Sequence, residues 1–177
     1  MSNRQKVYKS KLIIQNKEFF INKCNQAYDI LSKTLKTKDT TFTYSQYNLF
    51  AVTAADENFY QLYTELKNII RKTYKKDEPL WMQTWLNYHA VDSVLDWHDH
   101  GWLLHGYISI DPKDTSTIFD NGFEVNNKVG NIYIGPCKIK HKVVVHKPYE
   151  GYRITIGFDV CNHYFKNSLK GFSFIPI

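Results

Sequence analysis

Apolar residues in the first part of the chain recur at the spacing of an amphipathic helix. From Asn16 to about Leu35, and again from Ala55 to about Tyr74, they fall three or four positions apart, which places them on one helical face. The polar stretch Thr37–Thr41 separates the two segments and predicts a loop. Pro79 cannot continue a helix, so the second segment ends before it. The region up to about residue 80 is therefore predicted to be mostly helical.

Beyond this point the pattern changes to short segments rich in aromatic and β-branched residues, separated by turn residues such as Asn121-Gly122. The predicted strands are Met82–His89, Ser93–His100, Gly106–Ile110, Ser116–Phe119, Asn131–Ile134, His141–Val145 and Arg153–Asp159. Short strands at this spacing are typical of a sandwich or a jelly-roll barrel. We predict an α+β fold, mainly β, in which the N-terminal helices pack outside one sheet. The tail, Asn162–Ile177, is predicted to add a covering strand.

Length and composition favour one domain. A chain of 177 residues can bury a sizeable core, so we predict a single domain over 1–177, with a helical support region at 1–80 and a β core at 81–177. No apolar run is long enough to span a bilayer, no secretory signal opens the sequence, and nothing in it requires a protein partner. Three cysteines, an odd number, argue against a disulfide framework. The expected location is the cytoplasm, that of the host if the protein is viral.

The net charge of +6 suits a polyanionic partner. The lysines are nevertheless spread along the chain. Clusters at 33–38 and 71–76 suit solvated helix ends, where cations complement the helix dipole. A third cluster, at 138–142, alternates with less polar residues, as on the outer face of a strand. Solvated surface explains each cluster, and a polyanionic substrate stays open.

The segment Trp97–His100 has the highest concentration of candidate metal ligands in the sequence. On a strand alternate side chains share a face, so His98 and His100 would point the same way and Asp99 the opposite way. Imidazole binds Fe, Zn, Cu or Ni, and three imidazoles leave coordination positions open. We predict a catalytic metal site of His98, His100 and His141, with Asp99 as the alternative to His100 if a bulge re-aims it.

The third histidine of this site has a competitor. His141 follows a Gly-Pro turn and begins a predicted strand, whereas His146 lies beside Lys147-Pro148 at a strand end. The two are five residues apart and would face opposite sides of a regular strand. His141 is therefore favoured, and His163, in the tail, is predicted to lie on the surface.

Arg153 and Thr155 share one face of the last predicted strand. A guanidinium inside a barrel is too costly to leave unpaired, so Arg153 needs an acidic partner. That partner is either a protein carboxylate in a structural ion pair or a bound dicarboxylate held in two-pronged fashion, with the Thr155 hydroxyl assisting. The residues alone leave both open.

From about Trp85 to Val160 the chain resembles the iron(II)- and 2-oxoglutarate-dependent dioxygenases, in particular their small phage and marine bacterial branch. The signature of that family is His-x-Asp/Glu, a distal His, and an Arg or Lys on the next strand. His98 and His141 match the two histidines, and Arg153-Ile154-Thr155 matches an Arg-x-Ser/Thr motif. The chain departs from the signature at His100, although some phage-like members carry His-x-His there.

This resemblance implies a double-stranded β-helix, which is a cupin-like jelly roll with flanking N-terminal helices. It implies Fe(II) as the metal, 2-oxoglutarate as a co-substrate held by Arg153 and Thr155, and O2 as the oxidant. Asn87 and His89 occupy places where relatives carry co-substrate contacts. The predicted substrate-pocket residues are Trp97, Trp102 and His105.

Three functions are consistent with these observations. The first is a 2-oxoglutarate-dependent oxygenase that hydroxylates an unidentified small molecule, peptide or nucleic acid. The second is a cupin-like three-histidine metalloenzyme that does not use 2-oxoglutarate, in which a protein carboxylate would hold Arg153. The third is a basic jelly-roll module that binds nucleic acid or glycan without catalysis. Its binding would be sensitive to salt and would survive the loss of His98 and His141.

Overall fold

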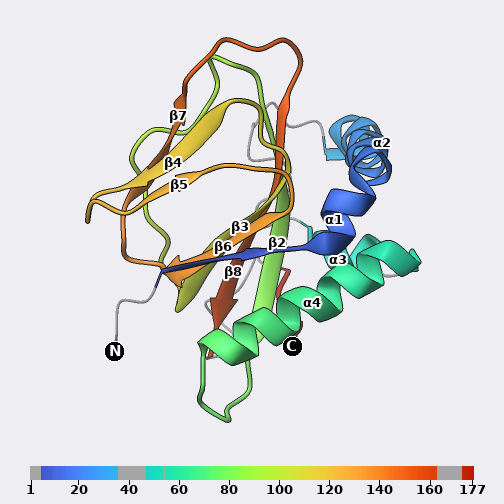
Figure 1. Cartoon of the computed structure of the whole chain (residues 1–177). Helices are drawn as coiled ribbons and strands as arrows, with labels where there is room; N and C mark the ends of the chain where they lie inside the picture. The colour runs from blue at the N-terminus through green and yellow to red at the C-terminus, as the bar shows by residue number, and fades with distance from the viewer. Residues whose placement is uncertain (1–4, 36–46, 54, 163–172) are drawn as a thin grey trace.

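The computed structural model describes residues 5–35, 47–53, 55–162 and 173–177, and its strands form two antiparallel sheets (Figure 1). The strands are β1 (Lys6–Lys9), β2 (Trp81–His89), β3 (Leu104–Asp111), β4 (Thr115–Phe119), β5 (Glu124–Asn126), β6 (Asn131–Pro136), β7 (His141–Val145), β8 (Arg153–Cys161) and β9 (Ile175–Pro176). The large sheet has six strands in the order β1-β6-β3-β8-β2-β9, and the small sheet has three in the order β5-β4-β7.

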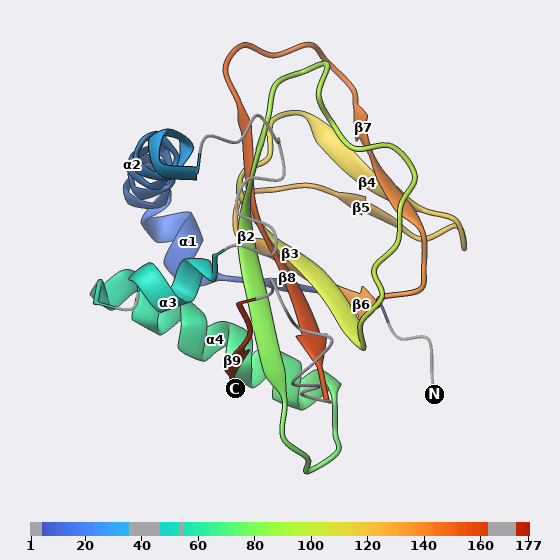
Figure 2. The same ribbon diagram turned by 180° about the vertical axis from the view of Figure 1, so that it is seen from behind.

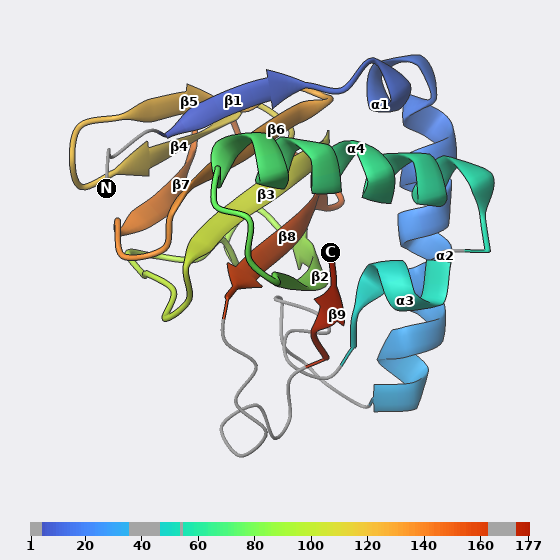
Figure 3. The same cartoon turned by 90° about the horizontal axis from the view of Figure 1, so that it is seen from below.

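The helices lie on the side of the large sheet that faces away from the small sheet (Figures 1 and 3). They are α1 (Lys11–Gln15), α2 (Lys17–Leu35), α3 (Leu49–Thr53) and α4 (Glu57–Thr73). The Asp56 side chain caps α4 by accepting hydrogen bonds from the backbone N–H groups of Asn58 and Phe59. Two of the helices, α2 and α4, correspond to the two segments with helical spacing. No helix in the described ranges is long and apolar enough to cross a membrane.

Strand β8 shows how the core positions the site, because all of its residues are buried but its two faces differ. One face carries Ile154, Ile156, Phe158 and Val160, which belong to the same buried apolar cluster as helix residues such as Phe20, Leu62 and Ile70. The opposite face carries Arg153, Thr155 and Asp159, and it is turned toward the small sheet. The helices therefore cover the apolar face of the large sheet and leave its polar face for chemistry.

Close packing of β3 against its neighbours depends on Gly106. A methyl group at this position would overlap the ring of Phe158 and the carbonyl oxygen of Tyr133. We expect Gly106→Ala to lower the free energy of unfolding by about 1–3 kcal/mol, because overpacking a sheet forces its backbone to move. Gly101→Ala is the control, since its Cβ would meet nothing within 4 Å. Urea denaturation that gave equal losses for both variants would contradict this packing.

The sequence prediction needs one correction and one addition here. Ser93–His100 is not a strand: the connection between β2 and β3 is irregular and joins the small sheet only through an isolated bridge between His98 and His141 (Figure 2). The region before residue 80 is mostly helical in its described part, as predicted, and it also contains β1, which pairs with β6 at the edge of the large sheet. The four residues of β1, Lys-Val-Tyr-Lys, show no polar–apolar alternation, and a segment this short cannot be distinguished from a loop by its pattern.

The remaining comparisons with the sequence prediction concern the short elements, the tail, one loop and the cysteines. The short elements α1, α3 and β5 were not predicted, and they hold only 5, 5 and 3 residues. At the C-terminus, β9 pairs with β2, which confirms a covering strand for the part of the tail that is described. The loop predicted at Thr37–Thr41 and the surface position of His163 lie outside the described residues. The three cysteines are buried and form no disulfide.

Candidate metal centre

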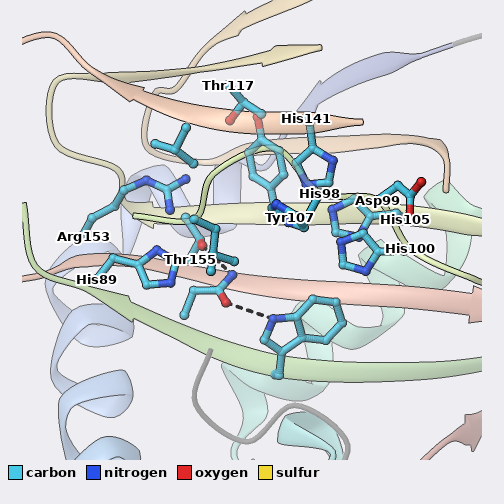
Figure 4. A pocket seen from close by; sticks show the side chains of 14 residues that line it. His89, His98, Asp99, His100, His105, Tyr107, Thr117, His141, Arg153 and Thr155 are labelled. Carbon is cyan, nitrogen blue, oxygen red and sulfur yellow. Dashed lines mark hydrogen bonds between the residues drawn. The ribbon is translucent and has the colours of Figure 1, made fainter. Parts of the chain in front are cut away.

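A cavity of about 320 Å³ lies between the two sheets (Figure 4). This volume is in the range of small-molecule sites in proteins. It is lined by Trp85, Asn87, His89, Leu95, His98, Asp99, His100, His105, Tyr107, Thr117, His141, Val143, Arg153 and Thr155. Figure 4 shows the imidazoles of His98, His100, His105 and His141 at one end and the guanidinium of Arg153 at the other.

Three of the predicted ligands meet at the histidine end of the cavity. One possible ligand atom from each of His98, His100 and His141 lies within 4.8 Å of the others. The backbone brings them together: the N–H of His98 donates to the His141 carbonyl at 3.1 Å, and the N–H of His141 donates back at 2.9 Å. The N–H of His100 donates to the carbonyl of Cys137 at 3.0 Å, which fixes the same segment beside the start of β7.

The hydrogen bonds at Nδ1 determine which nitrogen of each ring can bind a metal. The Nδ1 of His98 lies 2.7 Å from the Asp96 carbonyl oxygen, and that of His141 lies 3.5 Å from the carbonyl oxygen of Ile139. Because a carbonyl oxygen only accepts, both Nδ1 atoms carry the hydrogen and each neutral ring keeps its lone pair on Nε2. The Nε2 of His100 is buried and has no hydrogen-bond partner among the described residues. A buried imidazole nitrogen that lies beside other imidazole nitrogens and lacks a described hydrogen-bond partner suits the role of a metal ligand.

Burial keeps the clustered imidazoles in the form that binds metals. It lowers the pKa of His141 to about 3, and the nearby His98 and His100 add to this effect. Burial also lowers the pKa of His98, opposed by the bond to the Asp96 carbonyl, and it holds the pKa of His105 well below its usual value. These three rings are therefore neutral near pH 7, and no proton has to leave before an ion binds.

Sequence reasoning missed Asp159. Its side chain is fully buried, and its two carboxylate oxygens lie 3.2 Å from the Nδ1 of His100 and 3.0 Å from the Nδ1 of His105. With one carboxylate oxygen, His100 and His105 form a second group of possible metal ligands. A signal was present, since Asp159 has the same strand parity as Arg153 and Thr155.

Arg153 is buried at the other end of the cavity, at 3% exposure. Its Nε has no hydrogen-bond partner, and within the described part of the chain it forms no ion pair with a carboxylate. Burial lowers the pKa of its guanidinium, opposed by Tyr107 and Tyr149. A buried cation in this state suits an anionic ligand.

The strand register places the other predicted co-substrate residues beside Arg153. His89 lies opposite Arg153 and Asn87 opposite Thr155 in the pairing of β2 with β8. The Asn87 amide donates to the Thr155 hydroxyl at 3.1 Å and accepts from the indole N–H of Trp85 at 2.9 Å. All of these side chains line the cavity, so the inward face predicted for β2 is the observed one.

Other predicted residues are less central. Asp99 lines the cavity but is exposed and does not belong to the three-histidine group, so its alternative role gains no support from the geometry. The expected substrate-pocket residue His105 lines the cavity, but Trp97 and Trp102 do not. Trp97 is 42% exposed, with the Lys142 ammonium over its ring. Trp102 packs against Phe174.

The comparisons with known proteins assign no relative. No family model matches the sequence, and no curated protein matches it. Among solved structures, protein NMB1881 from Neisseria meningitidis is similar at a TM-score of 0.35 and 16% identity, over 50% of this chain and 91% of that chain. A likeness at this level assigns neither a family nor a function, so the functional argument depends on the site itself.

Proposed function

We propose that the protein is an Fe(II)- and 2-oxoglutarate-dependent oxygenase. The observation that carries this proposal is the pairing, in one cavity, of three clustered imidazoles with a buried guanidinium that has no carboxylate partner among the described residues. A three-histidine metalloenzyme that does not use 2-oxoglutarate explains the clustered imidazoles but gives the buried guanidinium of Arg153 no function. A metal-chelating dicarboxylate explains both, because it binds the ion at one end and a cation at the other.

The order of the strands supports a jelly roll as the scaffold. In the large sheet β2, β8, β3 and β6 are consecutive neighbours. In the small sheet the His98 bridge adds a segment beside β7, which gives the order His98 segment, β7, β4, β5. The chain crosses between the sheets from β2 to the His98 segment, back to β3, across to β4 and β5, and then through β6, β7 and β8. Four neighbouring strands in one layer, and three strands with the bridged His98 segment in the other, are joined in the way that is typical of a jelly roll.

In this proposal each end of the cavity has its own task. His98, His100 and His141 hold Fe(II), while Arg153 and the Thr155 hydroxyl bind the far carboxylate of 2-oxoglutarate. When bound, the metal, the co-substrate and O2 supply the oxidising chemistry. The protein orients these groups and excludes water, with the bulky side chains of Trp85 and Tyr107 forming part of the wall. The substrate to be hydroxylated stays a small molecule, a peptide or a nucleic acid.

The proposal is tested by anaerobic titration of 2-oxoglutarate into the Fe(II)-loaded protein. We expect a visible metal-to-ligand charge-transfer band that saturates with 2-oxoglutarate. Pyruvate is the matched control, because it has the same keto acid end but no second carboxylate for Arg153, and it should need a much higher concentration. No band despite bound iron would favour the metalloenzyme that does not use 2-oxoglutarate. Failure to bind iron at all would favour the non-catalytic binding module.

A further inference from the structure

We propose that Asp159 is a positioning residue of the metal centre, which fixes His100 as its Nδ1–H tautomer and supplies the negative charge that three neutral imidazoles lack. The inference rests on the metal site of the proposed function but not on 2-oxoglutarate or on turnover. It assigns a role to a buried carboxylate that contacts two rings of the histidine cluster.

The geometry is that of one carboxylate shared by two rings. One oxygen of Asp159 faces the Nδ1 of His100 and the other faces the Nδ1 of His105, at 3.2 and 3.0 Å. The two rings lie nearly parallel, 13° apart, with their centroids at 3.7 Å. Two stacked imidazoles on the two oxygens of one carboxylate are held in a single orientation, and neither ring can turn without losing its bond to Asp159.

This arrangement determines where the lone pair of His100 points. An ionised carboxylate only accepts hydrogen bonds, so the hydrogen of each ring must be on Nδ1. The lone pair of His100 is then on Nε2, the buried atom that has no partner in the described structure. Among the described residues, the His100 ring has its hydrogen-bond partner in Asp159, at Nδ1, and the alternative tautomer carries a hydrogen on Nε2 and cannot bind an ion through that atom.

Charge is the second part of the role. Three neutral imidazoles leave both positive charges of a divalent ion uncompensated in a partly buried site. Asp159 is fully buried one imidazole ring away, so water screens it little. Asp99 is nearer in sequence to the ligands but is exposed, and its field is weakened by solvent. Asp159 therefore holds the position from which a carboxylate strengthens a histidine ligand without binding the metal itself.

The isosteric variant Asp159→Asn gives a sharp test, with Asp99→Asn as the matched control. An amide of the same shape has one acceptor and one donor end, so it cannot accept from both Nδ1–H groups. One of the two rings must switch tautomer or lose its hydrogen bond. Asp99→Asn removes an equal charge beside the site without touching either ring.

The experiment has two readouts, which are Zn(II) affinity by chelator competition and the imidazole tautomers of the metal-free protein by ¹⁵N NMR. In the unmodified protein we expect the Nδ1–H form for both His100 and His105. In Asp159→Asn we expect one ring in the Nε2–H form and Zn(II) affinity reduced about 10–100-fold. In Asp99→Asn the tautomers should stay unchanged, and Zn(II) affinity should fall less than in Asp159→Asn because the Asp99 carboxylate is exposed to solvent. Adding His105→Phe to Asp159→Asn removes the competing donor, and it should recover part of the lost affinity.

The outcomes separate this inference from the proposed function. Wild-type affinity and tautomers in Asp159→Asn would overturn the positioning role while leaving the metal site intact. Absence of Zn(II) binding by the unmodified protein would remove the metal site itself. Should Asp159→Asn not fold, the tautomer of His100 in the unmodified protein still decides, because a hydrogen on Nε2 there would overturn the inference.

Discussion

His141→Ala is expected to abolish metal retention. Zinc sites in small proteins bind with about 10–16 kcal/mol, so losing one of three ligands at roughly a third of that energy lowers affinity by about 10³-fold. Loss of the β7 imidazole also leaves His98 with an alanine across the bridge that aligns the two ligands, although the backbone bonds of that bridge remain. Metal content after gel filtration against a weak chelator measures the effect.

The control is His146→Ala, which removes an imidazole from the end of the same segment. His146 is exposed and bonds through Nε2 to the Ser116 hydroxyl at 3.1 Å, outside the lining of the cavity. Its removal should leave metal content unchanged. Full occupancy in His141→Ala, or equal losses in the two variants, would show that the ion is held elsewhere.

The parts of the fold that sequence could predict are those with a long, regular pattern. Helices α2 and α4 span enough turns for apolar spacing to be unambiguous. On β2 and β8, residue parity alone separates the apolar face from the face of Asn87, Arg153 and Thr155. The same parity argument chose His141 over His146, and the structure places only His141 in the cavity.

Sequence reasoning failed where the geometry depends on contacts between distant segments. The Trp97–His100 segment was predicted as a regular strand, but a single bridge to His141 aims its ligands, and local alternation carries no information about such a bridge. Asp159 was overlooked because its role depends on two rings that lie 59 and 54 positions earlier in the chain. A buried carboxylate at the end of a strand becomes meaningful only once its partners are known.

Arg153→Met is expected to change 2-oxoglutarate affinity and protein stability in opposite directions. Binding of the co-substrate should weaken by at least about 30-fold, because truncating one partner of a buried charge pair costs about 2–5 kcal/mol. Metal retention should not change. The ligand-free protein should be as stable as the parent or more stable by about 1–4 kcal/mol, since an apolar side chain of similar length replaces a buried cation that lacks a carboxylate partner in the described residues.

The sign of the stability change separates the two explanations of Arg153 that the sequence left open. Had a protein carboxylate held this guanidinium, removing it would destabilise the fold by about 3–5 kcal/mol, because the partner would be left buried and uncompensated. Arg71→Met is the comparison for a guanidinium held by acceptors of the protein itself, since Arg71 donates to the backbone oxygens of Glu78 and Ile177, away from the cavity. It should destabilise the protein and leave 2-oxoglutarate binding intact. Urea denaturation and the charge-transfer titration would be run on both variants. If Arg153→Met destabilised the protein and left 2-oxoglutarate binding intact, the proposed role of Arg153 in binding the co-substrate would be refuted.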